Sequence, residues 1–300
     1  MTEKGSLRSE GADLDGVLDE LQREQQVKEI SGWDSGFANL NRVLDGMRPG
    51  FHVLIGPPGI GKTSFAKQLL DQVAERNRAP AIFFSFAESK KELRIKTLAR
   101  LSGLDHREIR RGSAYLLHWY GVPRLGGNNA EQLPPSWEKL KRMAEEAKVW
   151  LDAIYLVECQ RNWNMAQIEA RVAEVRTIAG REPAMIVIDD CQRLGDAHQS
   201  MEARMPIVVE QVQQAAMNLK APLIATWPDL DAASGVPPQR WNERMPGADV
   251  VLVMENDLER TKQLTEPNQA VVLHIAKNRG GEKGRIAFDF ITAFSRFKEA

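Results

Sequence analysis

Apolar runs alternate with amphipathic stretches along most of this chain. Short uninterrupted apolar runs predict buried strands, and they span Phe51–Ile55, Ala81–Phe86, Ile154–Val157, Met185–Ile188, Pro222–Thr226 and Asp249–Met254. Other stretches have apolar residues at helical spacing, namely Ser64–Glu75, Lys90–Leu101, Trp137–Trp150, Met165–Ile178 and Pro206–Leu219. This alternation predicts an α/β domain whose mostly parallel sheet is covered by helices on both faces.

The pattern changes near the C-terminus. Two further apolar runs, Ala270–Ala276 and Arg285–Phe290, are joined by the glycine-rich basic segment Lys277–Gly284, and together they predict a β-hairpin with a basic tip. Pro206 opens the last helical stretch, where proline suits the first turn of a helix. The segment Gly121–Pro135 carries paired glycines and prolines and predicts a long surface loop.

The first part of the chain differs from the rest. Residues 1–11 are polar, which is typical of a disordered tail. A short amphipathic helix follows, and its apolar face carries Leu14, Val17, Leu18 and Leu21. We therefore expect a tail and linker helix over residues 1–30 and a single domain over residues 31–300. The apolar stripe has to pack on this domain or on a neighbouring subunit, and the pattern favours neither.

The composition narrows the functional classes. The 300 residues include 40 basic and 41 acidic ones, so the net charge of -1 leaves any contact with nucleic acid to local loops. Two cysteines are too few for a disulfide framework, and the five histidines lack the spacing of a structural zinc site. There is no signal-peptide core and no run of the ~18 apolar residues that a membrane span needs. These features predict a soluble cytoplasmic protein with no membrane partner.

A phosphate-binding motif follows the first predicted strand. Residues 56–63 read Gly-Pro-Pro-Gly-Ile-Gly-Lys-Thr and match the pattern of Gly, four variable residues, Gly, Lys and then Ser or Thr. The glycines let backbone N–H groups point at the β-phosphate. Lys62 would reach the β- and γ-phosphates, and the Thr63 hydroxyl would hold Mg²⁺. The predicted contacts of a nucleoside triphosphate are Gly56, Pro57, Pro58, Gly59, Ile60, Gly61, Lys62, Thr63 and Ser64.

Two carboxylates that follow predicted strands are candidates for the rest of this site. Asp189 comes directly after Met185–Ile188, at the strand end where open α/β sheets place their ligands, and would complete the Mg²⁺ site. Alternatively, the Asp pair there simply ends a strand. Glu88 follows the second strand and is the candidate for orienting the attacking water. Alternatively, its charge favours the start of the helix Lys90–Leu101.

Several further motifs occur in an order that resembles one family. They are Ser31–Leu40, Gly46–Gly50, Phe84–Phe86, Ser89–Leu93, Leu101–Asp105, Ile109–Gly112, Ile186–Gln192, Ile275–Gly281 with Gly284, and Arg296–Phe297. Together with the phosphate loop, they make the chain similar to the C-terminal ATPase domain of DnaB-type replicative helicases. That domain belongs to the RecA-like superfamily, which also contains RadA- and KaiC-type proteins. The resemblance covers nearly the whole predicted domain.

The resemblance implies a RecA-like P-loop NTPase fold and a ring, usually hexameric, with ATP and Mg²⁺ bound between subunits. Gln192 matches the family's phosphate-sensing glutamine. Lys277 and Arg279 match hairpin residues that reach the γ-phosphate in the neighbouring subunit, where an arginine stabilises the charge that develops on the phosphoryl group. A basic tip without a partner in its own domain fits this role, although a solvated turn is the alternative. The helix Leu14–Leu21 matches a linker helix that docks on the adjacent subunit.

Three features depart from the family pattern. The glutamate that follows Phe-Ser-hydrophobic in the family is Ala87 here, so either hydrolysis is slow or Glu88 compensates from the next position. Thr226–Asp229 replaces the Ser-Gln pair that couples nucleotide state to the DNA loops. The residues before the domain are fewer than a folded domain needs, so the family's N-terminal helical collar is expected to be absent.

DNA contacts would then come from loops at a central pore. The candidates lie in residues 195–205, with His198 and Arg204, and in residues 229–247, with Arg240, Trp241 and Arg244. A basic groove with an aromatic side chain binds single strands without sequence preference. The same loops also carry acidic residues, so DNA binding and its absence both stay open.

Two functions remain open on these grounds. The first is a Mg²⁺-dependent ring ATPase that translocates on single-stranded DNA, with protein partners from replication or mobile-element DNA metabolism. Its catalytic residues would be Lys62, Glu88, Asp189, Gln192, Lys277 and Arg279. The second is an ATP-dependent assembly or regulatory ATPase that does not unwind DNA. The intact phosphate loop and hairpin favour the first, whereas Ala87 and Pro228 favour the second.

Overall fold

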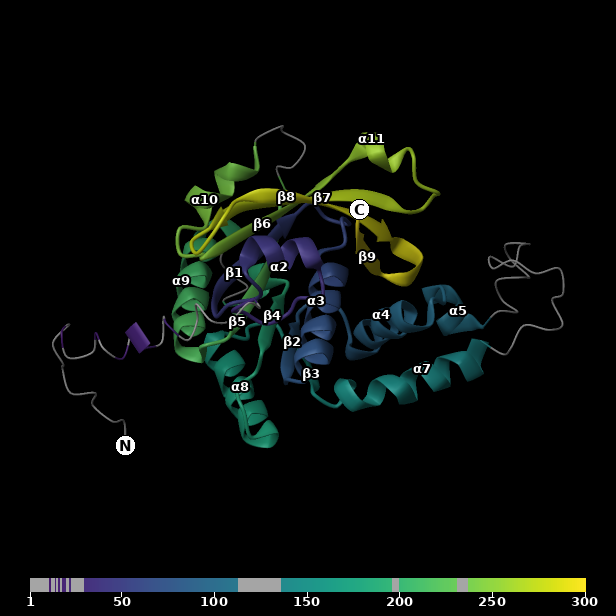
Figure 1. Ribbon diagram of the computed structural model, residues 1–300, viewed down its shortest axis with the longest axis horizontal. Coiled ribbons are helices and arrows are strands. Elements are labelled where there is room, and N and C mark those ends of the chain that lie inside the picture. The colour runs from purple at the N-terminus through teal and green to yellow at the C-terminus, as the bar shows by residue number, and fades with distance from the viewer. Residues whose placement is uncertain are drawn as a thin grey trace.

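The computed structural model describes residues 30–112, 136–195, 200–230 and 237–300, together with scattered positions between 11 and 22. In these ranges a nine-stranded sheet has the order β3-β2-β4-β5-β1-β6-β7-β8-β9 (Figure 1). Its strands are β1 Gly50–Gly56, β2 Ala81–Ser85, β3 Ile154–Glu158, β4 Met185–Asp189, β5 Pro222–Pro228, β6 Val250–Asn256, β7 Gln269–Asn278, β8 Gly284–Ile291 and β9 Arg296–Glu299. The strands from β3 to β6 in this order are parallel, and β7, β8 and β9 add antiparallel pairs. The predicted α/β fold is confirmed.

The parallel register brings the strand ends that matter for function to one edge of the sheet. Gly56 at the end of β1 is paired with Pro228 at the end of β5. Ser85 at the end of β2 is paired with Asp189 at the end of β4. Since carboxyl ends of parallel strands meet at one edge, the loops after these four strands surround a common space.

Helices cover both faces of the sheet. They are α2 Ala38–Leu44, α3 Lys62–Asn77, α4 Lys90–Ser102, α5 His106–Arg111, α7 Ser136–Leu151, α8 Met165–Ala179, α9 Met201–Leu219, α10 Trp241–Arg244 and α11 Leu258–Thr261. Helices α2, α3 and α4 contribute to the buried cluster on one face, and α8, α9 and α10 to the cluster on the other. Along β1 the side chain of Leu54 enters the first cluster and its neighbours Val53 and Ile55 the second, as alternation in a strand requires. Helix α7 packs against α4 and α5 beyond the β3 edge (right in Figure 1).

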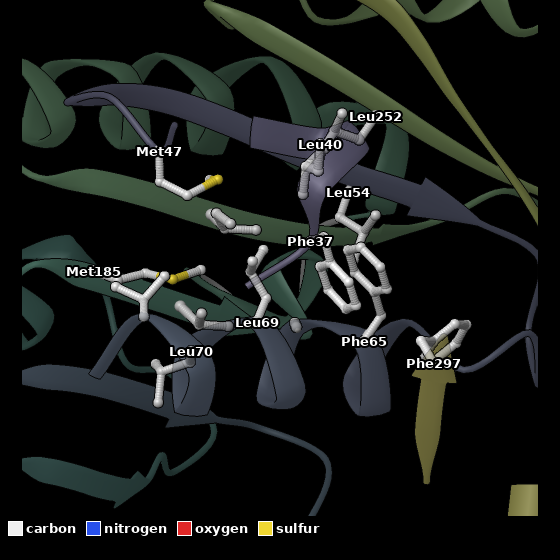
Figure 2. Close-up of a cluster of buried hydrophobic side chains, with 14 of the residues drawn as sticks. Phe37, Leu40, Met47, Leu54, Phe65, Leu69, Leu70, Met185, Leu252 and Phe297 are labelled. Carbon is white, nitrogen blue, oxygen red and sulfur yellow. The ribbon is translucent and has the colours of Figure 1, made fainter. Parts of the chain in front are cut away.

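Aromatic side chains hold the phosphate-loop helix to the sheet. Phe65 of α3 stacks on Phe37 with ring centroids 5.4 Å apart, and its edge contact with Phe297 has a centroid distance of 5.2 Å (Figure 2). A second edge contact, with Phe288, has a centroid distance of 5.5 Å. Each such pair contributes about 0.5–1.5 kcal/mol beyond the burial of its area. Gln68 of α3 also bonds the backbone of Phe297 in both directions, at 2.7 and 2.9 Å. The start of α3 is therefore fixed against β8 and β9.

The structure corrects two local predictions. Helix α9 begins at Met201 with Ser200 as its cap, so Pro206 lies at the sixth helical position and not in the first turn. A proline there removes one backbone hydrogen bond of the helix. The hairpin strand extends to Asn278, so Lys277 belongs to β7 and pairs with Val251 instead of lying in the tip.

Some predictions fall outside the described residues. The predicted loop Gly121–Pro135 lies there, as do His198 and residues 231–236 of the second candidate DNA loop. Of the predicted linker helix, Leu14 and Leu18 are described as helical and are 51% and 53% exposed. Within the described ranges, no helix combines the length and apolarity needed to cross a bilayer.

Candidate active site

The phosphate loop connects β1 to α3 and closes tightly on the core. Gly59 and Gly61 have φ angles of 82° and 100°. Residues that carry a Cβ atom rarely adopt such positive φ angles. A Cβ at Gly61 would lie 2.9 Å from the Phe290 ring and 3.0 Å from the Phe297 ring, whereas a Cβ at Gly59 would have no neighbour within 4 Å. The backbone at Gly61 is thus pressed against two aromatic rings that themselves stack at 4.2 Å.

These two glycines give a matched pair of stability predictions. We expect Gly59→Ala to lower the free energy of unfolding by about 1–2 kcal/mol, because only the backbone conformation is strained. Gly61→Ala also overpacks the Phe290 and Phe297 rings and should lose about 1–3 kcal/mol more. Urea denaturation of the two variants measures the difference. Equal losses of unfolding free energy in the two variants would show that the Phe290 and Phe297 rings can move aside without destabilising the protein.

Lys62 closes the loop onto itself. Its Nζ donates to the carbonyl oxygens of Gly56 at 2.8 Å and Pro57 at 3.0 Å. Burial lowers the pKa of Lys62, and the nearby Asp190, Asp189 and Asp229 carboxylates oppose that change. The ammonium group thus lies near three carboxylates and uses two of its three N–H donors on the loop carbonyls, which leaves one donor for a phosphate.

Thr63 and Asp189 are brought together as predicted from their motifs. The Thr63 hydroxyl donates to Asp189 Oδ2 at 2.9 Å, and the Thr226 hydroxyl of β5 donates to Oδ1 at 2.7 Å. Burial raises the pKa of Asp189 to about 6, although both hydroxyls stabilise the carboxylate. A buried carboxylate beside a hydroxyl that can rotate to present its lone pairs is a set of hard oxygen donors, and these suit Mg²⁺. The residues therefore fit the predicted metal.

Gln192 lies in a short 3₁₀ turn, Cys191–Arg193, that follows β4. Its Nε2 donates to Asp190 Oδ2 at 2.6 Å, and Arg193 Nε lies 3.4 Å from the same oxygen. The amide is thus turned toward Asp190 in this state. Its predicted contact with a phosphate stays a prediction.

Glu88 lies beside the phosphate loop and does not cap helix α4. The cap is Ser89, whose hydroxyl accepts from the Glu92 N–H. Ser85 forms a tight turn with Glu88, since its hydroxyl donates to the Glu88 carbonyl at 2.7 Å and accepts from the Glu88 N–H at 3.0 Å. The Glu88 carboxylate pairs with Lys96 at 3.3 Å. Glu88 directly precedes the cap residue, so a favourable interaction with the start of α4 stays an alternative to the catalytic role.

Lys277 and Arg279 lie near the amino-terminal ends of the parallel strands, whereas the phosphate loop follows the carboxyl end of β1. Lys277 Nζ donates to the Pro246 carbonyl at 2.9 Å, and Arg279 Nη1 pairs with Asp249 at 2.8 Å. Asp249 also accepts from the N–H of Phe51, at the start of β1. The expectation that the basic tip has no partner in its own domain is wrong, although Arg279 remains 60% exposed.

The three arginines predicted to contact DNA have different surroundings. Arg240 is 11% exposed and donates to both oxygens of Asp229 at 2.7 and 2.6 Å. Arg244 is exposed, and its guanidinium lies 5.2 Å from the centre of the Trp241 ring. Arg204 is half-buried on the first turn of α9. Arg244 is thus open to solvent, whereas the guanidinium of Arg240 is bound by Asp229.

Three functional neighbours escaped the sequence analysis. Thr226 lies within the buried strand β5, and its hydroxyl at the end of an apolar run in the sequence was the available signal. Asp229 donates its N–H to the Gly56 carbonyl at 2.8 Å, so it ties the segment after β5 to the phosphate loop. Lys96 pairs with Glu88, and nothing in its helical pattern distinguishes it from other lysines.

Comparison with known proteins matches this chain to one protein family and to several relatives. The family described as the DnaB-like helicase C terminal domain matches residues 32–227. A replicative DNA helicase DnaB from Geobacillus stearothermophilus is 24% identical over 288 residues, which cover 90% of this chain and 57% of that protein. The corresponding protein of Leifsonia xyli subsp. xyli is 22% identical, covering 94% and 59%. The chain thus spans less than two thirds of the length of these curated relatives.

Solved structures share the fold. One ATPase domain has a TM-score of 0.79 at 20% identity and covers 98% of this chain and 100% of that chain. A DnaB-like replicative helicase, solved for its interactions with primase, has a TM-score of 0.78 at 19% identity, covering 96% and 68%. A KaiC-like protein from Pyrococcus horikoshii has a TM-score of 0.57 at 15% identity, covering 90% and 99%. The fold is therefore that of RecA-like ATPase domains, as the sequence predicted.

Proposed function

Because the chain belongs to the family of DnaB-like helicase C-terminal domains, we propose that it is a Mg²⁺-dependent ATPase that works as a ring. The observation that carries this proposal is the phosphate loop whose Thr63 hydroxyl is hydrogen-bonded to Asp189 at the end of β4. Thr63 and Asp189 would hold the metal, and Lys62 would contact the phosphates. When bound, Mg²⁺ supplies positive charge that offsets the charge on the phosphate oxygens.

The ring proposal is supported by the separation of two parts of the site. Arg279 is anchored near Phe51, and the phosphate loop starts at Gly56. Five residues of extended strand between them span roughly 17 Å. This exceeds the reach of an arginine side chain, so Lys277 and Arg279 would serve the nucleotide of a second copy. Head-to-tail contacts of this kind close into a ring when the rotation allows it, and we propose a hexamer.

Hydrolysis would be completed by residues of two subunits. Glu88 would orient the attacking water, Gln192 would contact the γ-phosphate, and Arg279 of the adjacent copy would stabilise the charge on the transferred phosphoryl group. Ala87 stands where the family has a glutamate, so the proposal assigns this task to Glu88. The ion pair of Glu88 with Lys96 supports it, because Lys96 also donates to Ser64, directly after the phosphate loop.

Single-stranded DNA is the proposed track of this ring, and replication or mobile-element DNA metabolism the proposed setting, in the cytoplasm. Arg244 supports a contact to DNA, because its guanidinium is exposed and an exposed cation suits the backbone of a single strand. The second candidate, a regulatory ATPase without unwinding activity, is favoured by Ala87 and by Pro228, which lies in the segment that replaces the family's coupling pair. Protein partners from the proposed processes would load the ring or recruit it.

ATP hydrolysis by the purified chain tests the proposal. We expect turnover that stops when EDTA removes Mg²⁺, and a several-fold increase when a single-stranded oligonucleotide is added. Glu88→Gln should lower kcat by about 10²- to 10⁴-fold, the usual contribution of a general base. Turnover that is indifferent to DNA would favour the regulatory function. A Glu88→Gln variant as fast as the wild type would remove Glu88 from the catalytic set.

A further inference from the structure

Lys96 lies between Glu88 and the phosphate loop. It belongs to the second turn of α4, and its side chain is 19% exposed. Its Nζ lies 3.3 Å from Glu88 Oε1 and donates to Ser64 Oγ, also at 3.3 Å. Ser64 directly follows Thr63 in the first turn of α3. The ammonium group therefore joins the two chain segments that flank the proposed nucleotide site.

The pair gives the two carboxylate oxygens of Glu88 different surroundings. Oε1 faces Lys96. Oε2 is buried and, within the residues that the structure describes, accepts no hydrogen bond. A group that takes a proton from water needs a fixed orientation and an oxygen that is not already occupied. Among the described residues, the contact of Lys96 with Oε1 is therefore what orients the Glu88 carboxylate.

Nearby negative charge favours a cation at this point. The carboxylate of Glu88 is close enough to Asp189 for the two charges to interact, and Asp190 adds another negative charge next to Asp189. Like charges in a part-buried site repel one another strongly enough to displace a side chain that is not held. Ion pairs at exposed positions contribute little, but Glu88 and Lys96 are 27% and 19% exposed. The pair is therefore shielded from solvent enough to fix the carboxylate.

We infer that Lys96 is a positioning residue for ATP hydrolysis, which holds the Glu88 carboxylate through Oε1 in the orientation from which it takes the proton of the attacking water. The inference rests on the proposed ATPase function. In the step that it serves, the water oxygen forms a bond to the γ-phosphorus, and the bond from that phosphorus to the β–γ bridging oxygen breaks. ADP leaves with the electron pair, and the proton of the water passes to Glu88. Lys96 itself contacts neither water nor phosphate in this role.

Steady-state kinetics of three single variants tests the inference. Lys96→Ala should lower kcat by about 10- to 100-fold, as expected when a catalytic group is misplaced by about 1 Å, and should change KM by less than about twofold. Lys96→Arg should restore most of kcat, because a guanidinium supplies the same charge to a single oxygen. Lys91→Ala, at an exposed position on the same helix, serves as the control and should match the wild type.

A double variant and a binding measurement separate this role from others. If Lys96 acts through Glu88, then Lys96→Ala combined with Glu88→Gln loses no more kcat than Glu88→Gln alone. Affinity for a fluorescent ATP analogue should remain within about twofold of wild type, since Lys96 does not contact phosphate. A matching loss of affinity would show that Lys96 shapes the phosphate loop through Ser64, and it would overturn the inference. Full activity of Lys96→Ala would overturn it too, while a wild-type chain without ATPase activity would overturn the proposed function itself.

Discussion

Replacing Arg279 by alanine is expected to lower kcat for ATP hydrolysis by about 10³-fold or more, the range measured when an arginine supplied by a neighbouring subunit is lost. The physical reason is electrostatic, because a guanidinium close to the γ-phosphate offsets the charge that builds up as the phosphoryl group is transferred. The fold should survive the change, since the Arg279–Asp249 pair has a 60% exposed guanidinium and such pairs contribute at most about 1 kcal/mol.

Three measurements make this result specific. Lys283→Ala changes another exposed basic residue of the hairpin tip and should keep wild-type kcat. The midpoint of thermal unfolding of Arg279→Ala should lie within a few degrees of the wild type. Nucleotide affinity should fall much less than kcat, because the interaction strengthens in the transition state. Wild-type turnover by Arg279→Ala would remove the residue from the site.

Replacing Lys62 by alanine is expected to lower kcat by about 10²- to 10³-fold, the usual effect of removing a group that stabilises the transition-state charge. The same change should weaken ATP binding, since Lys62 is the positive charge at the mouth of the loop. In the structure this ammonium bonds the carbonyls of Gly56 and Pro57, so its loss also loosens the loop. Isothermal titration with ATP and single-turnover hydrolysis measure the two effects separately.

A neighbouring variant provides the control for Lys62. Lys67 of the same helix is buried and hydrogen-bonded to Thr97 at 2.8 Å, and it also contacts Asp71. Lys67→Met removes a lysine that stabilises the helix pair α3 and α4 but that the proposed site does not use. We expect it to lower the free energy of unfolding and to leave KM for ATP nearly unchanged. A Lys62→Ala variant with the same kinetics as Lys67→Met would contradict the assignment of Lys62 to the phosphates.

Much of the fold is readable from the sequence because parallel strands are buried on both faces. The run Met185–Ile188 is apolar throughout, and the strand found there includes these four residues and extends one residue further, to Asp189. The order of motifs also predicts that Thr63 and Asp189 meet, although they lie 126 residues apart. Such a long-range contact follows from the topology, since a phosphate loop and a strand-end carboxylate share one edge of the sheet.

Other features depend on packing that no local pattern encodes. Strand β9 has four residues with only Phe297 buried, so it lacks a strand pattern of its own and forms because Phe297 fills the space against Phe65 and Phe290. The partner of Lys96 could not be predicted, because exposed and paired lysines have the same helical spacing. The partner of Arg240 was equally unpredictable, since nothing in the sequence indicates its ion pair with Asp229.

The claim on which the account depends is that each nucleotide lies between two copies of the chain. Mixing Lys62→Ala with Arg279→Ala protein tests it, because each variant is expected to be inactive alone while one supplies an intact Arg279 and the other an intact phosphate loop. If subunits exchange at random in a ring, about a quarter of the interfaces combine both intact parts, so about a quarter of wild-type ATPase activity should return. No recovery in mixtures whose subunit exchange is verified by native mass spectrometry would contradict the account.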